Sequence, residues 1–184
     1  MLFFTSDSHF GHEHILRYCN RPFSSVKEMD EELILRWNER ISENDTVYHL
    51  GDFTLGGHDA AVRYLERLGG RIFLQQGSHD NRWFDKDFGD GRLSTIPPLC
   101  SVELPIQKSK HKQVVVLCHY ALRVWDKSHY ASWHLFGHSH GKLEPHGLSF
   151  DVGVDSHNFY PWSLDEVVQK MNTLNPIEDY SKGE

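Results

Sequence analysis

Short apolar runs alternate along the chain with stretches in which apolar residues recur every three or four positions. The short runs predict β-strands, and the periodic stretches predict amphipathic helices. The predicted strands span residues 2–5, 46–50, 71–75, 99–104, 114–118, 133–136 and 149–154. The run 114–118 is apolar throughout, which is typical of a strand buried on both faces.

Three helices are predicted between these strands. In residues 27–41 an apolar residue recurs at every fourth position from Met29, and the serines at 24 and 25 offer an N-terminal cap. A second helix spans 59–68 and ends at two glycines, and a capping box from Ser163 to Glu166 opens a last helix that runs to about Met171. Strands interleaved with helices predict an α/β or α+β fold with some parallel strand pairing.

Length and composition indicate one globular domain. The chain has 184 residues, of which 39% are hydrophobic and 24% charged, and we assign residues 1–175 to the domain and the polar stretch 176–184 to a tail. The longest apolar run, five residues, is far shorter than the roughly 20 that span a bilayer. The N-terminus has no basic lead, and three cysteines without C-x-x-C spacing fit a reducing cytoplasm, where we expect the protein to reside.

The charge balance argues against a protein that grips extended duplex nucleic acid. Nineteen basic residues stand against 26 acidic ones, for a net charge of −7, and no basic run is long enough to follow a phosphate backbone. Two bound divalent cations would nevertheless add four positive charges at one place. The 14 histidines are unusual, and histidine is the commonest metal ligand in proteins.

Histidine and aspartate directly follow five of the predicted strands. Because the carboxyl ends of strands gather binding sites in sheets of this kind, five such exits on one rim would bring these side chains together. Each motif alone has an ordinary explanation as a turn, a cap or a structural histidine, but the ordered set favours a common site. The exits carry Ser6-Asp7-Ser8-His9, Gly51-Asp52, Gly77-Ser78-His79-Asp80, His119 and Gly137-His138-Ser139-His140.

The spacing and chemistry of these residues predict a metal site. Asp7 and His9 are two residues apart, as are His138 and His140, so in an extended chain each pair points to one side. Carboxylate and imidazole ligands together suit Zn²⁺, Mn²⁺, Fe or Ni²⁺, and neither a Ca²⁺ cage nor a thiolate site. Six ligands are too many for one tetrahedral ion and fit two ions that share Asp52; they are Asp7, His9, Asp52, His119, His138 and His140.

At these motifs the chain resembles the calcineurin-like metallophosphoesterases. The signature of that family runs D-x-H, G-D, G-N-H-D/E, a lone H and G-H-x-H, and its counterparts here span residues 7 to 140 in the same order. The opening stretch 6–12 and the later Arg21-Pro22-Phe23 look like a small bacterial or phage-type subgroup. The resemblance implies two mixed β-sheets packed as a sandwich and flanked by helices.

The resemblance also implies a role for each residue. The first ion would be held by Asp7, His9, Asp52 and His140, and the second by Asp52, Ser78, His119 and His138. His79 would be the general acid beside the leaving group, with Asp80 as its orienting partner. The family has Asn where this chain has Ser78, and a serine hydroxyl is shorter and a poorer oxygen donor. We therefore expect a weakened second metal position and reduced turnover.

The implied reaction is hydrolysis of a phosphate ester, with a phosphodiester favoured. A hydroxide held between the two ions would attack phosphorus, and the substrate would be a small phosphoester such as a nucleotide or a short oligonucleotide. Candidate substrate contacts near the motifs are His12, Arg21, Arg82 and Arg123. The alternatives are a phosphomonoesterase and a catalytically weakened protein that binds metal or a nucleotide.

Overall fold

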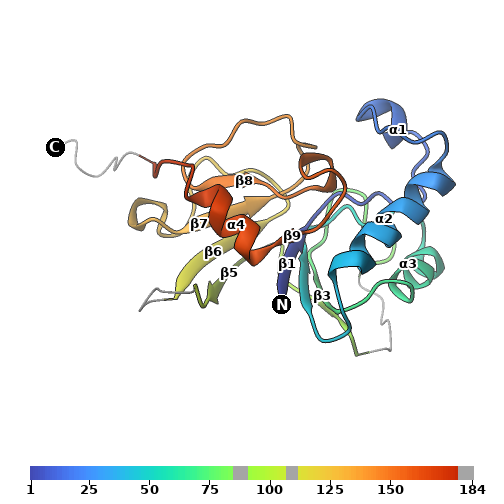
Figure 1. Cartoon of the computed structure of the whole chain (residues 1–184), viewed down its shortest axis with the longest axis horizontal. Helices are drawn as coiled ribbons and strands as arrows, with labels where there is room; N and C mark the ends of the chain where they lie inside the picture. Colours follow the sequence, from blue (N-terminus) through green and yellow to red (C-terminus); the bar gives the residue numbers. More distant parts are fainter. Residues whose placement is uncertain (85–90, 107–111, 178–184) are drawn as a thin grey trace.

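Two mixed β-sheets form the centre of the protein, in a computed structural model that describes residues 1–84, 91–106 and 112–177 (Figure 1). The first sheet has the strand order β4 (Leu93–Thr95), β3 (Arg71–Leu74), β2 (Thr46–His49), β1 (Leu2–Thr5) and β9 (Trp162–Ser163). The second has the order β5 (Leu99–Leu104), β6 (Gln113–Cys118), β7 (Trp133–Phe136) and β8 (Ser149–Asp151). The helices are α1 (Ile15–Tyr18), α2 (Val26–Arg40), α3 (His58–Leu65) and α4 (Leu164–Met171).

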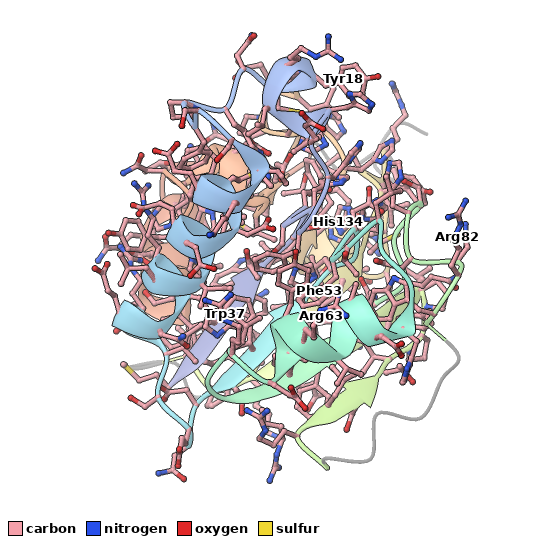
Figure 2. The ribbon with its side chains drawn as sticks, turned by 90° about the vertical axis from the view of Figure 1, so that its right-hand side faces the viewer. Tyr18, Trp37, Phe53, Arg63, Arg82 and His134 are labelled. Carbon is pink, nitrogen blue, oxygen red and sulfur yellow. The ribbon has the colours of Figure 1, made fainter. Side chains whose placement is uncertain are left out.

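The alternation of side chains along β1 separates two hydrophobic cores. Phe3 belongs to the core between the first sheet and the helices α2 and α3, in which Trp37 of α2 is buried (Figure 2). Phe4 points the other way, into the core that the first sheet shares with β6, β7, β8 and α4. The fold is therefore a sandwich of two mixed sheets flanked by helices, which confirms the predicted fold class.

The predicted elements are recovered with small shifts at their ends. Strands 2–5, 99–104 and 133–136 have the predicted bounds, and the last helix carries the predicted capping box between Ser163 and Glu166. The predicted strand 149–154 ends at Asp151, and Val154 begins a 3₁₀ turn. The sequence analysis missed α1, β4 and β9, which have four, three and two residues and are too short to show a period.

Parallel pairing places the strand exits at one edge of each sheet. In the first sheet β1, β2 and β3 run parallel to one another, and in the second β6 and β7 run parallel. The two edges meet, because the residue after β1, Ser6, bridges to Gly153 beyond β8, and the backbone amide of His138 beyond β7 reaches the Asp7 carboxylate at 2.9 Å. The five motifs therefore converge on the line where the sheets join.

No helix within the described ranges combines the length and hydrophobicity that crossing a bilayer requires. The assignment of residues 1–175 to one domain stays a prediction. Most of the predicted tail, residues 178–184, lies outside the described residues.

His134 on β7 is fully buried and makes the stability of the protein sensitive to acid (Figure 2). Its Nδ1 donates to the Val116 carbonyl at 3.1 Å and its Nε2 accepts from the Leu122 amide at 3.1 Å, so the neutral ring is satisfied at both nitrogens. Burial lowers the pKa of His134 to about 4, below the roughly 6.5 of an unfolded chain. The unfolded state then binds more protons, and folding stability falls as the pH drops from about 6.5 to about 4.

We expect the variant His134→Gln, which stays neutral at every pH, to lose less stability over this interval than the wild type, by roughly 3 kcal/mol in all. Urea unfolding at a series of pH values measures the difference. The buried Ser132, which does not titrate, supplies the control, and Ser132→Ala should follow the wild-type pH dependence. Parallel pH profiles for His134→Gln and the wild type would contradict the expectation.

Candidate metal centre

The turns that carry the candidate ligands share an uncommon backbone conformation. Asp7, His9, Asp52, His138 and His140 have φ angles of 59°, 52°, 53°, 64° and 50°. This left-handed region is costly for residues other than glycine, at about 1–3 kcal/mol each, and such residues cluster at functional sites. The surrounding structure must therefore hold these turns in place.

Close approach of two loops explains why glycine stands at 51 and 77. Gly51 has a φ of 97°, and a Cβ atom built on it would lie 2.5 Å from the backbone nitrogen of Gly77. A Cβ on Gly77 would in turn overlap the Asp52 amide and carboxylate. Only glycine at both positions lets the loop after β3 rest on the turn that presents Asp52.

Asp52 lies at the centre of the candidate site. Its Oδ2 atom is 3.4 Å from His119 Nε2 and 3.6 Å from His9 Nε2, and 4.0 Å from His79 Nε2. Asp52 and His9 come from the first sheet, whereas His119 follows β6 of the second. A single carboxylate thus faces imidazoles from both halves of the sandwich.

Two groups of side chains that could hold a metal ion lie at Asp52, and a third group, formed by His9, Asp52 and His79, shares a residue with each of them. In one of the two, ligand atoms of Asp7, His9 and His140 all lie within 4.8 Å of one another; in the other, those of Asp52, His119 and His138 do. The rings of His9 and His140 are 5.1 Å apart between centroids, as are those of His119 and His138. The structure therefore brings together all six residues that the sequence analysis proposed as ligands.

Buried polar atoms without partners fit a cation at this place. Within the described residues, Asp7 Oδ1, His9 Nε2 and His119 Nε2 are buried and have no hydrogen-bond partner. The other ring nitrogen of His119 lies 2.8 Å from the Leu50 carbonyl, so that nitrogen carries the proton and Nε2 of the neutral ring presents a lone pair. An unpaired buried polar atom is costly, and a metal ion bound to these three atoms would remove that cost.

The carboxylates of the cluster also need positive charge. Burial raises the pKa of Asp7 to about 7, because nothing near it fully compensates the loss of water. Burial also opposes ionisation of Asp52, but the nearby charges of His119 and His9 outweigh it and lower the pKa of Asp52. In turn the two carboxylates raise the pKa of His119 against the effect of burial. A divalent ion at this place would favour the ionised form of both carboxylates.

Asp80 does not orient His79, contrary to our expectation from the resemblance. Its Oδ2 accepts the amides of Asp52 at 2.8 Å and Gly77 at 2.9 Å, and its Oδ1 accepts the amides of Phe53 at 3.0 Å and Thr54 at 3.4 Å. Both carboxylate oxygens of Asp80 accept hydrogen bonds from backbone amides. Asp80 therefore fixes the turn of Asp52 rather than the ring of His79.

His79 and Ser78 both lie against Asp52. The His79 side chain is 40% exposed, and its backbone amide donates to Asp52 Oδ1 at 2.8 Å. The Ser78 hydroxyl lies 3.2 and 3.1 Å from the two Asp52 oxygens. A serine that donates its proton to Asp52 is directed at the carboxylate, so its hydroxyl is a weak candidate ligand.

The candidate substrate contacts separate into two kinds. Arg21 is buried and its guanidinium is fully occupied by contacts within the protein, so the expectation that it contacts substrate is wrong. His12 lies beside the cluster, with its Nδ1 3.3 Å from His9 Nδ1 and its ring 5.7 Å from that of His79. Arg82 and Arg123 are exposed, and Arg82 points away from the body of the protein (Figure 2).

Sequence reasoning missed two aspartates that support the ligand loops. Asp155 accepts a hydrogen bond from His140 Nδ1 at 2.7 Å. Asp151 accepts the backbone amide of Gly141 at 2.9 Å and the hydroxyl of Ser139. Asp151 is the last residue of β8, the strand after the last motif, and Asp155 follows that strand. The signal available in the sequence was therefore a sixth strand exit that carries aspartates, residues 151–155.

Comparisons with known proteins give relatives of similar length. No family model matches the chain. The chain is similar to the uncharacterized protein MJ1445 of Methanocaldococcus jannaschii, at 33% identity over 193 residues that cover 97% of each protein. It is also similar in structure to AQ665 from Aquifex aeolicus, a protein of unknown function, with a TM-score of 0.66, 21% identity, and coverage of 92% of this chain and 98% of that one.

A third likeness is weaker. A solved novel archaeal phosphodiesterase superposes with a TM-score of 0.49 and 18% identity, over 83% of this chain and 82% of the other. That level of similarity carries no argument about function. The identity and coverage shared with MJ1445, in contrast, are high enough to show common descent. The chain therefore belongs to the protein family that includes the uncharacterized protein MJ1445 of Methanocaldococcus jannaschii.

Proposed function

We propose that the protein is a metal-dependent phosphoesterase that prefers phosphodiesters. The observation that carries this proposal is the pair of His/Asp groups on either side of Asp52, with three buried ligand atoms that lack a partner among the described residues. The ordered motif resemblance to calcineurin-like metallophosphoesterases supports the same reaction class. Mixed carboxylate and imidazole ligands favour Mn²⁺, Fe, Zn²⁺ or Ni²⁺.

Two divalent ions fit the arrangement better than one. Together they would neutralise phosphate oxygens and lower the pKa of a water molecule toward neutrality. The chain's own residues supply the rest of the site: Asp52 lies between the two groups, and its Oδ2 is nearly equidistant from the Nε2 atoms of His9 and His119. The first ion would be held by Asp7, His9, Asp52 and His140, and the second by Asp52, His119 and His138 with Ser78 as a weak fourth ligand.

In this proposal His79 protonates the leaving group. Its ring lies 5.1 Å from that of His9, and its side chain is partly open to solvent, whereas the neighbouring His9 and Asp52 are buried. A departing alkoxide oxygen beside the cluster would be within reach of this imidazole. As an imidazolium His79 would donate a proton to that oxygen, a step typically worth 10²–10⁴-fold in rate.

Free positive charge near the cluster is scarce among the residues that the structure describes, and this favours a diester. A phosphomonoester carries two negative charges at neutral pH and is usually held by several cationic side chains. Here Arg21 is paired with Asp155 inside the protein, and Arg82 points outward (Figure 2). A singly charged diester, such as one in a nucleotide or a short oligonucleotide, needs less compensation.

The proposal is tested with protein stripped of metal and reconstituted with Mn²⁺ or Ni²⁺. We expect metal-dependent hydrolysis of bis-p-nitrophenyl phosphate that exceeds hydrolysis of p-nitrophenyl phosphate, together with bound metal measured by mass spectrometry. The reverse preference would favour a phosphomonoesterase. Absence of turnover with every metal, combined with binding of a phosphate ligand, would replace the proposal with a protein that binds metal or a nucleotide without catalysis.

The serine at 78 should limit both metal content and rate. We expect Ser78→Asn, which supplies an amide oxygen with a longer reach, to raise bound metal toward two ions per chain and to raise the rate of diester hydrolysis. Metal analysis and initial rates measure both effects. Ser101 on β5 is exposed and belongs to neither metal-ligand group, so Ser101→Asn is the control. Equal metal content and equal rates in Ser78→Asn and the wild type would refute the expectation.

A further inference from the structure

A buried ion pair links loops that carry three of the candidate ligands. Arg21 Nε and Nη2 donate to the two oxygens of Asp155 at 2.9 and 2.8 Å, and the side chains are 0% and 8% exposed. This is the bidentate geometry that a planar guanidinium makes with a carboxylate, and that lysine cannot reproduce. Arg21 precedes α2, and Asp155 lies in the turn that follows β8.

The two partners of this ion pair each hold a different part of the cluster. Arg21 Nη2 also donates to the Asp7 carbonyl at 2.7 Å, and its Nη1 donates to the Ser8 carbonyl at 2.9 Å. Asp155 Oδ2 accepts the Nδ1 proton of His140 at 2.7 Å. The pair therefore connects the Asp7–His9 turn of the first sheet with the His140 turn of the second.

We propose that Arg21 and Asp155 are positioning residues for one of the two metal ions, the ion bound by Asp7, His9 and His140. Asp155 fixes which nitrogen of His140 carries the proton and so leaves Nε2 free to bind the ion. Arg21 fixes the left-handed turn that presents Asp7 and His9. Outer partners of this kind commonly raise metal affinity 10–100-fold.

Asp155 itself is poorly suited to bind the ion. Ligand atoms of Cys19, His140 and Asp155 also lie within 4.8 Å of one another. Both Asp155 oxygens, however, already accept from Arg21, and a cation there would lie against the guanidinium charge. The contacts of Arg21 and Asp155 should affect only one of the two metal positions. Neither residue belongs to the group of Asp52, His119 and His138, which would bind the other ion.

The experiment is a titration of the metal-free protein with Co²⁺. Calorimetry measures the affinity of each binding step, and visible absorption reports the surroundings of the bound ion. The inference rests on the proposed metal centre but needs no turnover. In the wild type we expect the tighter binding step to belong to the Asp7, His9 and His140 group, because Ser78 weakens the other. In Asp155→Asn that step should weaken by about 10–100-fold and its absorption spectrum should change, while the second step keeps its affinity.

The controls separate positioning from general damage. Asp45 is a buried aspartate that binds the Ser42 amide and the N-terminal amine, and Asp45→Asn should bind Co²⁺ as the wild type does. If Asp155→Asn fails to fold, Arg21→Lys replaces it, since it keeps the charge but loses the forked contacts; the same tighter step should weaken. If the folded variant bound Co²⁺ with wild-type affinity, or if both binding steps weakened equally, the inference about Arg21 and Asp155 would be wrong. The proposed metal centre itself would still stand. A wild-type protein that binds no Co²⁺ would overturn the inference and the metal centre together.

Discussion

Asp52→Asn is expected to lower diester hydrolysis by at least about 1,000-fold and to reduce metal binding at both positions. Asparagine keeps the size of the side chain and can still accept the His79 amide through its oxygen. It removes the charge that faces the Nε2 atoms of His9 and His119 at 3.6 and 3.4 Å. Metal-ion stabilisation of a transition state is worth several kcal/mol, and each 1.4 kcal/mol corresponds to a tenfold change in rate.

Steady-state rates and metal analysis on the same samples test this expectation. The buried Asp30 offers a matched control, because it binds the Gly11 amide and the Tyr64 hydroxyl and belongs to neither group of metal ligands. Asp30→Asn should retain wild-type metal content. If Asp52→Asn retained both its metal and its rate, the arrangement of two ions around one carboxylate would be wrong.

His79→Ala is expected to lower the rate by 10²–10⁴-fold for esters with poor leaving groups and by much less for bis-p-nitrophenyl phosphate. A nitrophenolate leaves without a proton, whereas an alkoxide needs one. Because His9 and Asp52 each also belong to a candidate metal group that does not contain His79, removal of the His79 side chain should leave metal content unchanged. Rates for a series of alkyl and aryl diesters measure the dependence on the leaving group.

The exposed His129 provides the control, and His129→Ala should show no change in this series. A uniform loss in His79→Ala across good and poor leaving groups would argue against a role as general acid. It would favour instead a contact between the imidazole and the phosphate oxygens, which are common to all the substrates.

Local pattern was sufficient to predict much of the fold. The strand 133–136 and the capping box at Ser163 are visible because each depends on residues that are adjacent in the sequence. Strands such as β9, with two residues, form only because the neighbouring strand β1 is already in place. Their existence depends on tertiary pairing, which carries no signal in a short stretch of sequence.

The candidate ligands could be predicted because each follows an apolar run, but their supporting residues could not. Arg21 lies close to the motifs in the sequence and looked like a substrate contact, yet it pairs with Asp155, which is 134 positions away. Asp80 directly follows His79, the proposed general acid, yet it accepts hydrogen bonds from backbone amides of the Asp52 turn. Which donor a buried charge meets is decided by packing between loops that are distant in the chain, so adjacency in the sequence is a poor guide.

The position of the candidate site between the two sheets has a consequence for the stability of the protein, should the site bind an ion. Asp7, His9 and Asp52 follow strands of one sheet, and His119, His138 and His140 follow strands of the other. An ion held by both sets cross-links the halves of the sandwich, so its binding free energy adds to the free energy of unfolding. If the proposed site binds such an ion, a chelator would therefore lower the melting temperature of the protein as well as remove the metal.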